Sequence, residues 1–353
     1  MAITLGKTLQ NLPGPVLITG HTGFKGTWMT FLLQQLGVSV VGYSLKPEMD
    51  SVYDRAKLKG HIPEKFADVR NYAKLKKFIE KHKPSVIFHM AAQPLVLESY
   101  KTPLETFDVN VMGTANLLDV AFHSSSVKVV IVVTTDKVYR NDESGRPFIE
   151  NDPLEGKDPY SASKVGTEAV VRAWQQISEV SGGPKVVSVR AGNVVGGGDY
   201  AQNRLLPDLI KAILNDKILE VRNPQSTRPW QHVLDPLCGY ILTAEAVANG
   251  AKINAINFGP GEDSLSVNKV TEIAYRTWNN SKVSLKIDKN QNNEAEARTL
   301  NLDVSKAHNE IEWKPKWNQK KSIEKTIIWW EKVLKSEASV VGAIVDDINE
   351  ILD

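Results

Sequence analysis

The sequence has little cysteine: Cys238 is the only one among 353 residues. A single thiol excludes an intrachain disulfide and any thiol-rich metal site, and we expect no metal. Long hydrophobic runs are missing as well, and residues 1–15 have no apolar core like that of a secretory signal. We therefore expect a cytoplasmic protein that has no membrane segment.

A strong charge of one sign is also absent. Lys plus Arg amounts to 43 and Asp plus Glu to 41, which gives a formal net charge of +2. A nucleic-acid partner would need basic residues gathered on one face, so we expect no such partner. The composition, with 42% hydrophobic and 24% charged residues, is that of an ordinary globular protein. The length suits one two-part enzyme or two small domains.

Segments typical of strands and of helices alternate along the first half of the chain. Strands are expected at 16–19, 38–43, 84–90 and 127–133, and helices at 72–82 and around 109–122. The run at 127–133 is almost entirely β-branched, which is typical of a strand covered on both faces in a parallel sheet. The alternation from 16 to about 195 predicts an α/β fold with a Rossmann-type, doubly wound parallel sheet.

After residue 195, glycine, proline and isolated charges dominate the sequence. We expect a dinucleotide-binding domain over 13–190 with a return segment at about 231–258. A smaller C-terminal substrate-binding lobe is expected from 191–230 and 259–334. The segment 335–353 is an extra tail, whose apolar residues at helical spacing predict an amphipathic helix on the protein's own surface or on a partner subunit.

The stretch Gly20-His-Thr-Gly23-Phe-Lys-Gly26 lies between the first predicted strand and a helical pattern. The first glycine permits a tight turn, the second lets the backbone approach a pyrophosphate, and the third lets helix and strand pack closely. The helix N-terminus then offers free N–H groups to the phosphates. The candidate cofactor-binding residues here are Gly20, Thr22, Gly23, Phe24, Lys25 and Gly26.

An acid for the ribose hydroxyls is missing at the end of the second predicted strand, where the chain reads Tyr43-Ser44-Leu45-Lys46. Ser44 can hydrogen-bond a ribose and Lys46 can meet a 2′-phosphate, so this position leaves both NAD and NADP open. Further along, Asp68, followed by Val69, is a candidate acceptor for the adenine amino group. The alternative for Asp68 is an aspartate that caps a loop or a helix.

The candidate catalytic residues form two groups. Tyr160 and Lys164 lie four apart, one turn on a common helix face. A lysine ammonium near a tyrosine and a nicotinamide lowers the pKa of the phenol, which then acts as base on a substrate hydroxyl during hydride transfer. Thr135, just past the buried strand, is placed to hydrogen-bond the same hydroxyl. The adjacent Asp136 and Lys137 offer an acid and a base at a second carbon, and the alternative is a solvated loop pair.

Longer stretches extend these motifs over about residues 13–333. They are Gly20-His-Thr-Gly-Phe-Lys-Gly, His89-Met-Ala-Ala-Gln-Pro, Asp136-Lys137, Tyr160-Ser-Ala-Ser-Lys164, Arg190-Ala-Gly-Asn-Val-Val-Gly-Gly-Gly-Asp, Arg222-Asn-Pro-Gln-Ser-Thr-Arg-Pro-Trp-Gln-His-Val and Asn301-Leu-Asp-Val-Ser-Lys306. In them the chain resembles the CDP-glucose 4,6-dehydratases, a family of extended short-chain dehydrogenases. Like that family it has a lysine at 137, where dTDP-glucose dehydratases have glutamate. It departs from the family at Arg140, where an acid is frequent, and at Asn293, where a histidine is usual.

The resemblance implies oxidation, elimination and reduction with bound NAD, which turn CDP-glucose into its 4-keto-6-deoxy form with no net redox change. Tyr160 then takes the 4-hydroxyl proton, Lys137 removes the C5 proton, and Asp136 protonates the departing C6 hydroxyl. A homodimer or higher homo-oligomer and a place in deoxysugar and lipopolysaccharide biosynthesis are implied as well. The further cofactor-binding residues are Ala91, Ala92, Gln93, Asn110, Tyr160 and Lys164, and the substrate-binding residues are Gln93, Asn193, Arg204, Leu205, Arg222, Arg228 and Arg298. For Arg222 and Arg298 a surface or packing role fits equally well.

Three other functions fit parts of the pattern: a dehydratase for another nucleotide sugar, a 4-epimerase, and a catalytically silent dinucleotide-binding sensor. An epimerase needs the Tyr160–Lys164 pair but no acid and base beside Thr135, so Asp136 and Lys137 argue against it. A sensor usually lacks the tyrosine or the lysine, and here both are present.

Overall fold

The computed structural model describes residues 5–353 apart from 202, 216, 218, 222, 279–284 and 288–298. A seven-stranded sheet in the order β11-β6-β5-β4-β1-β2-β3 forms its centre, and every neighbouring pair in it is parallel. The strands are β1 (Val16–Thr19), β2 (Val40–Ser44), β3 (Glu64–Phe66), β4 (Val86–His89), β5 (Val129–Val133), β6 (Lys185–Ala191) and β11 (Ala255–Phe258). The doubly wound parallel fold expected from the sequence is confirmed.

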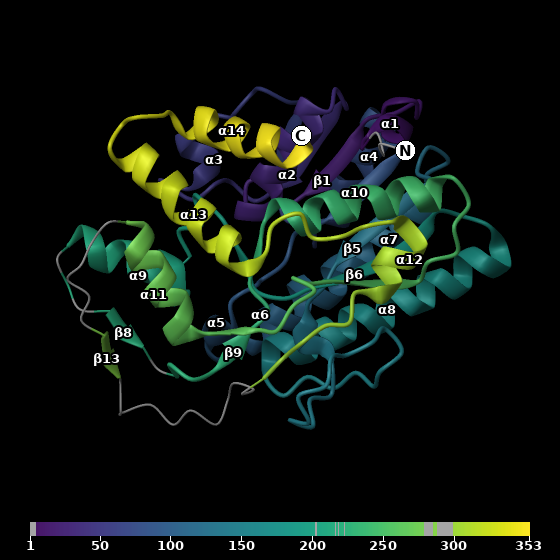
Figure 1. Ribbon diagram of the computed structural model, residues 1–353. Helices are drawn as coiled ribbons and strands as arrows, with labels where there is room; N and C mark the ends of the chain where they lie inside the picture. Colours follow the sequence, from purple (N-terminus) through teal and green to yellow (C-terminus); the bar gives the residue numbers. More distant parts are fainter. Residues whose placement is uncertain are drawn as a thin grey trace.

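Helices cover both faces of the sheet (Figure 1). On one face lie α2 (Phe24–Gln35) and α10 (Leu234–Ala248), and on the other α4 (Tyr72–His82), α7 (Gly113–Phe122) and α8 (Pro159–Ser181). Because side chains alternate along a strand, Val16 and Ile18 pack with the first group of helices and Leu17 with the second. The same alternation buries all of β5, which explains its unbroken β-branched sequence.

The remaining helices of the first half are short. They are α1 (Lys7–Gln10), α3 (Val52–Arg55), α5 (Val96–Lys101), α6 (Pro103–Phe107), the π-helical turn η1 (Asp108–Met112) and the 3₁₀ turn η2 (Asp136–Val138). The helix expected around 109–122 is thus divided at Gly113 into η1 and α7. The turn η2 follows β5 and carries the candidate acid and base.

A smaller group of elements stands beside the sheet, and in Figure 1 α9, α11, β8 and β13 lie together at one end of the molecule. Its elements are β7 (Val194–Val195), α9 (Leu205–Leu214), β8 (Leu219–Val221), β9 (Thr227–Arg228), β10 (Gln231–His232), β12 (Leu265–Ser266), α11 (Val267–Thr277) and β13 (Leu285–Ile287). Three two-stranded pairs, β7–β10, β9–β12 and β8–β13, hold these segments together. β11 then returns to the main sheet beside β6. The helix α12 (Ser305–Ile311) instead contacts α10 and β11 of the main sheet.

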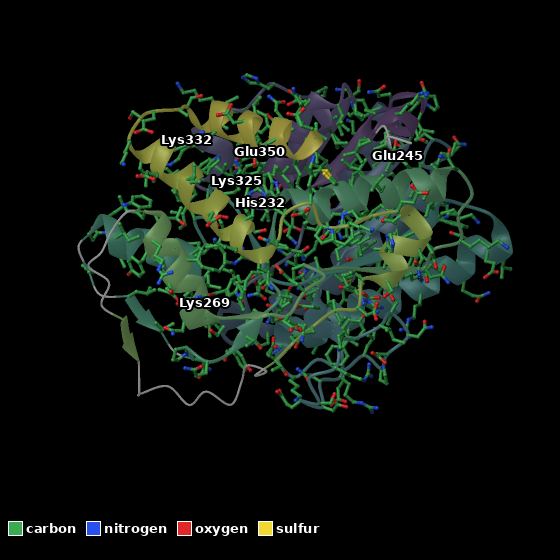
Figure 2. All side chains as sticks on the ribbon, in the orientation of Figure 1. His232, Glu245, Lys269, Lys325, Lys332 and Glu350 are labelled. Carbon is green, nitrogen blue, oxygen red and sulfur yellow. The ribbon has the colours of Figure 1, made fainter. Side chains whose placement is uncertain are left out.

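The C-terminal tail forms α14 (Val340–Leu352), which packs on α2 and on α13 (Gln319–Leu334) of the same chain. Its apolar face is buried, and its acidic face meets lysines of α13. Lys325 pairs with Glu350 and Lys332 with Asp346, and Figure 2 labels both lysines and Glu350. Lys325 Nζ lies 2.7 Å from both Asp347 Oδ1 and Glu350 Oε2. In the described part of the chain, no helix has the length and apolarity that crossing a bilayer requires.

Candidate active site

The glycine turn after β1 has the geometry that its sequence predicts. Gly20 has φ +75°, and a Cβ there would lie 2.8 Å from the backbone nitrogen of Ala91. A Cβ on Gly26 would lie 2.1 Å from the carbonyl oxygen of Gly20, while Gly23 is less crowded, with its nearest neighbour at 3.4 Å. Only glycine therefore lets this turn close between the N-terminus of α2 and the loop after β4, a shape that suits a pyrophosphate.

The end of β2 lies directly beside the glycine turn. Thr22 Oγ1 is 2.7 Å from Ser44 Oγ, and the same hydroxyl donates to the carbonyl of Leu45. Ser44 is buried and Lys46 is exposed. The hydroxyl pair thus occupies the place at which dinucleotide-binding folds usually present an acid to a ribose.

A second contact of the glycine turn is not apparent from any sequence motif. His21 is buried, and its Nε2 lies 2.9 Å from Glu64 Oε2 on β3. The Tyr53 hydroxyl donates to the same oxygen at 2.5 Å, and these hydrogen bonds lower the pKa of Glu64 against the opposing effect of burial. The His21 ring covers Gly42, where a Cβ would come within 2.6 Å of it. The turn is therefore tied to β2 and β3, and only the folded sheet reveals the pairing.

Asp68 follows β3 and is held by Arg70. The Arg70 backbone N–H donates to Asp68 Oδ1 at 2.8 Å, and its guanidinium nitrogen Nη2 donates to Oδ2 at 2.6 Å. The hydrogen bonds from Arg70 lower the pKa of the Asp68 carboxyl, so it is ionised at neutral pH. Val69, next to it, is buried and lies over Gly113, where a Cβ would be only 2.7 Å from its methyl group.

The loop after β4 carries Ala91, Ala92 and Gln93. The Gln93 N–H donates to Asn110 Oδ1 at 2.8 Å, and the Asn110 amide donates back to the Gln93 carbonyl at 3.1 Å. Asn110 also donates to Ser163 Oγ at 2.8 Å on α8. These bonds occupy the Asn110 amide, so this residue fixes the shape of the loop at the candidate cofactor site.

The catalytic residues expected from the sequence come together at the carboxyl ends of β5 and β6. Burial raises the pKa of Tyr160 to about 12, and a hydrogen bond with Thr135 opposes that shift. Burial lowers the pKa of Lys164 to about 8, and the Glu168 carboxylate opposes it. Lys164 Nζ donates to the Val133 carbonyl at 3.2 Å, which ties it to the end of β5.

Asp136 is almost fully enclosed, with 2% of its surface exposed. Thr135 Oγ1 donates to its Oδ1 at 3.0 Å, while no described residue hydrogen-bonds its Oδ2. A Cβ on Gly192 would lie 3.1 Å from Oδ2, so glycine leaves room at this oxygen. Burial raises the pKa of Asp136, and the nearby charges of Lys137, Arg228 and Lys25 oppose it. A carboxyl in this setting retains a proton more readily than an exposed one, as a general acid must.

Lys25 adds a cation that the motif alone did not place in the catalytic centre. Its pKa is lowered to about 8 by burial and by the positive charges of Arg204 and Lys164, while Asp136 and Asp199 oppose the shift. Lys25 therefore belongs to both the glycine turn and the group of charges around Asp136. The described residues bring together no group of three or more His, Cys, Asp or Glu side chains suited to a metal ion.

The candidate substrate residues are only partly assembled in the described structure. Arg204 Nη1 lies 2.8 Å from Asp199 Oδ2, and its charge reaches Tyr160. Arg228 is buried near Asp136, Asn193 is half-buried just before β7, and Leu205 begins α9. Arg222 and Arg298 lie outside the described residues.

The parallel sheet, the glycine turn and the Tyr160–Lys164 pair define an enzyme of the extended short-chain dehydrogenase class. Residues 17–326 match the family model described as GDP-mannose 4,6 dehydratase, and the chain belongs to this family. It is similar to the CDP-glucose 4,6-dehydratase of Salmonella typhimurium, with 39% identity over 335 residues, which cover 92% of this chain and 93% of that protein.

Solved structures agree on the fold. One is TunA, an NAD-dependent NDP-hexosamine 5,6-dehydratase of tunicamycin biosynthesis, at 27% identity and a TM-score of 0.75 over 90% of this chain and 98% of TunA. Another is the dTDP-glucose 4,6-dehydratase of Bacillus anthracis str. Ames in complex with NAD, at 22% identity and a TM-score of 0.76 over 90% of this chain and 97% of that one.

Proposed function

We propose that the protein is an NAD-dependent 4,6-dehydratase that converts CDP-D-glucose to CDP-4-keto-6-deoxy-D-glucose and that it works in the cytoplasm. The observation that carries this proposal is the buried Asp136 carboxyl beside Thr135, close to Tyr160 and next to Lys137. Removal of water needs this additional acid and base, whereas a 4-epimerase does not. The similarity to the Salmonella typhimurium enzyme supports CDP-glucose as the substrate.

NAD, when bound, supplies the hydride acceptor for C4 and the hydride donor for C6. The glycine turn fits its pyrophosphate because no Cβ crowds the backbone at Gly20 and Gly26. Ser44 and Thr22 would hold the ribose and Asp68 the adenine amino group. The similarity to TunA, which is NAD-dependent, supports NAD as the cofactor.

In the oxidation, Tyr160 accepts the proton of the sugar 4-hydroxyl as the C4 hydrogen leaves as hydride. Because burial raises the pKa of Tyr160, its phenolate depends on neighbouring positive charge. Arg204 provides such a charge, and we assign the same effect to Lys164, one turn further along α8. Thr135 hydrogen-bonds Tyr160, so it is placed to contact the same sugar 4-hydroxyl. The 4-ketone that results makes the neighbouring C5 proton acidic.

In the elimination, Lys137 removes the C5 proton and Asp136 gives its own proton to the C6 hydroxyl, which departs as water. Lys137 can then return a proton to C5. With the hydride that NAD would supply at C6, the net change is loss of one water with no net oxidation. Asp136 is suited to the acid role because burial favours its protonated form. Lys137 lies beside it on η2 and is half-buried.

The nucleotide diphosphate needs cationic donors, and we assign them to the smaller lobe over 191–230 and 259–334, with residues 13–190 and 231–258 forming the NAD domain. Arg204 and Arg228 supply guanidinium groups near Tyr160 and Asp136, respectively. Asn193 and Leu205 border the same region, and Gln93 faces it from the loop after β4. Arg222 and Arg298 complete the proposed set.

We further propose a homodimer. Large apolar side chains are exposed on α5, α6 and η1, where Leu104 is 73% exposed and Met112 52%. Together with Phe107 and Val111 they line a hollow on the surface. A second copy of the chain would remove this surface from water.

The test is a substrate panel. The purified protein, with only trace NAD added, is incubated with CDP-, dTDP-, UDP- and GDP-glucose in deuterated water. The expected result is a 4-keto-6-deoxy sugar from CDP-glucose with deuterium at C5. Turnover of another nucleotide sugar would show that the substrate has a different nucleotide base from cytosine. A 4-epimerised sugar and no keto sugar would replace the dehydratase by an epimerase, and no reaction with cofactor bound would favour a sensor.

A further inference from the structure

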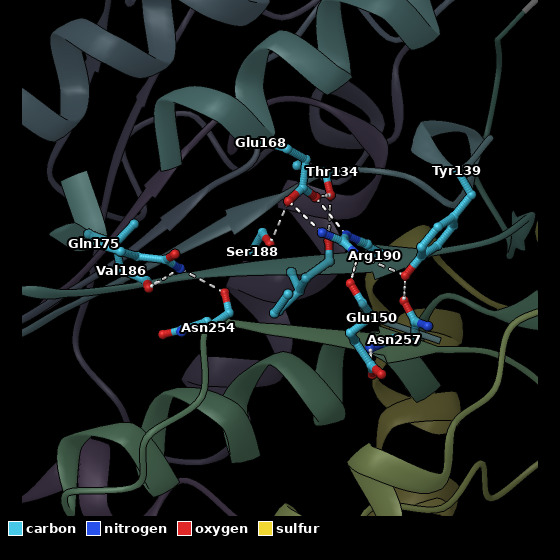
Figure 3. A network of polar contacts seen from close by, with 12 residues as sticks. Thr134, Tyr139, Glu150, Glu168, Gln175, Val186, Ser188, Arg190, Asn254 and Asn257 are labelled. Carbon is cyan, nitrogen blue, oxygen red and sulfur yellow. Dashed lines mark hydrogen bonds and ion pairs between the residues drawn. The ribbon is translucent and has the colours of Figure 1, made fainter. Parts of the chain in front are cut away.

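A buried ion pair, Glu168–Arg190, contacts both ends of the segment 134–139 that contains η2 (Figure 3). Glu168 stands on α8, one turn after Lys164, and only 1% of it is exposed. Its Oε1 accepts from Thr134 Oγ1 at 2.6 Å and from Arg190 Nε at 2.8 Å. Its Oε2 accepts from Ser188 Oγ at 2.9 Å and from Arg190 Nη2 at 2.8 Å. A buried pair stabilises its surroundings only when its hydrogen bonds are complete, and both carboxylate oxygens here have two donors.

Arg190, the other member of the ion pair, contacts the C-terminal end of the same segment at Tyr139. Its Nη1 donates to the Tyr139 hydroxyl at 2.8 Å, and its guanidinium carbon lies 5.0 Å from the centre of the Tyr139 ring. Tyr139 in turn donates to Asn257 Oδ1 at 2.7 Å on β11. Glu168 therefore holds Thr134 and Arg190 holds Tyr139, so the two members of one ion pair hold the two ends of the segment that carries the acid and the base.

We propose that Glu168 and Arg190 are positioning residues for the dehydration, an inference that rests on the proposed function. They touch neither substrate nor cofactor. They fix η2 relative to α8, so that Asp136 and Lys137 on the turn meet the same sugar as Tyr160 and Lys164 on the helix. A displacement of about 1 Å in such an arrangement costs on the order of 10²-fold in rate.

The pair has an electrostatic role as well. Burial lowers the pKa of Lys164, and the Glu168 carboxylate is the neighbour that opposes this shift. The other titratable groups within electrostatic reach are Lys25 in the glycine turn and His89 on β4, and Tyr160 lies one turn earlier on the same helix. Glu168 thus helps Lys164 to keep the charge that favours the Tyr160 phenolate.

The test compares four variants of the whole enzyme with one control variant. Glu168→Gln removes the charge, and Glu168→Asp keeps it on a shorter side chain. Thr134→Val and Tyr139→Phe each remove one tether of the turn and leave both charges of the pair in place. Gln175→Met is the matched control, because Gln175 joins the same helix to the Val186 and Asn254 carbonyls, at 2.9 and 2.8 Å, without touching the turn.

We expect Glu168→Gln to lower kcat on the order of 10²-fold, with KM for CDP-glucose changed less than about three-fold. In Glu168→Gln the loss of activity at high pH should begin at lower pH than in the wild type, because Lys164 loses its proton earlier. Glu168→Asp should restore the wild-type activity at high pH. Thr134→Val and Tyr139→Phe should lower kcat without changing the pH at which activity is lost. Gln175→Met should keep the wild-type kcat and pH profile.

A titration that needs no substrate accompanies the kinetics. NMR of protein labelled with ¹³C at the lysine Cε carbons, with Lys164→Met to assign the signal, should show a lower pKa for Lys164 in Glu168→Gln than in the wild type. Equal pKa values, or a kcat for Glu168→Gln no lower than for Gln175→Met, would overturn the inference. If Glu168→Gln gives no folded protein, wild-type kcat in both Thr134→Val and Tyr139→Phe would do the same. A wild type that acts on no nucleotide sugar would instead contradict the proposed function.

Discussion

At the scale of single side chains, Asp136 and Lys137 are neighbours in sequence with different surroundings. Asp136 is 2% exposed and accepts from Thr135, and burial raises its pKa. Lys137 is half-buried at the rim of the turn. A proton donor to a leaving hydroxyl benefits from this enclosure, because burial favours the protonated form of the carboxyl. The environment therefore divides the acid and base roles between two adjacent residues.

The division predicts different losses for Asp136→Asn and Lys137→Met. Both should lower kcat by about 10²–10⁴-fold, the usual contribution of a positioned acid or base. In deuterated water, sugar recovered from Asp136→Asn should contain deuterium at C5, because Lys137 still exchanges that proton. Sugar recovered from Lys137→Met should contain none. Mass spectrometry of the recovered nucleotide sugar measures this, and deuterium in the Lys137→Met sample would assign the base elsewhere.

The part of the candidate site that could be predicted from the sequence consists of residues that are close to one another along the chain. Tyr160 and Lys164 share one helix turn, and Thr135 and Asp136 follow a buried strand, so their positions follow from the chain itself. Glu64 could not be found in this way, because it meets His21 only after β3 has paired with β2. The role of Glu168, on α8, depends likewise on Arg190, which reaches it from β6. Contacts between distant segments have no signature in a single sequence.

At the scale of elements, α14 stabilises the two helices on which it lies. Ala343, Ile344 and Ile348 are buried against that surface. Ser339 caps the N-terminus of α14 by accepting from the Gly342 N–H, and Lys316 Nζ donates to the Ile351 carbonyl near its C-terminus. Because α14 packs on α2, whose N-terminus faces the proposed phosphate site, the tail supports the cofactor domain.

Two lysines of α13 test this docking as a matched pair. Lys325 is 10% exposed in its side chain and holds Asp347 and Glu350, whereas Lys332 is 41% exposed and lies 3.5 Å from Asp346. Lys325→Met should lower the free energy of unfolding by about 3 kcal/mol, because it leaves a buried carboxylate unpaired. Lys332→Met should cost less than about 1 kcal/mol. Urea unfolding of both variants measures the difference, and equal losses would show that the buried pair does not hold α14.

The elements themselves were predictable where the burial pattern is strong. The prediction of β1 at 16–19 and of α4 at 72–82 matches the structure, and the other predicted strands differ from it only at their ends. The strand β3 was missed because Glu64, Lys65 and Phe66 show neither an apolar run nor a clear alternation on this short edge of the sheet. η1 lies within the segment that the spacing predicts as ordinary helix, and such π-turns occur mostly as single turns inside α-helices.

At the scale of the whole molecule, the proposed dimer surface is connected to the cofactor site. Arg70 holds Asp68 at the proposed adenine end, and its Nη1 lies 2.9 Å from Asp108 Oδ2 on η1. η1 also carries Asn110, which fixes the loop at Gln93. The exposed apolar side chains of α6 and η1 therefore lie on the elements that position both ends of the cofactor site. Burying them in a second copy should stabilise these elements in the arrangement that binds NAD.

This connection predicts that assembly and cofactor affinity change together. Leu104→Glu places a charge on an apolar side chain that is 73% exposed, and it should shift the protein from dimer to monomer and weaken NAD binding. Met49→Glu is the control, because Met49 is 87% exposed on a loop after β2 and belongs to neither α6 nor η1. Light scattering gives the mass of each variant, and calorimetric titration with NAD gives its affinity. A monomeric wild type would contradict the dimer itself. A monomeric Leu104→Glu that binds NAD as the wild type does would instead separate assembly from the cofactor site, since a folded η1 would then hold Arg70 and Asn110 without a partner.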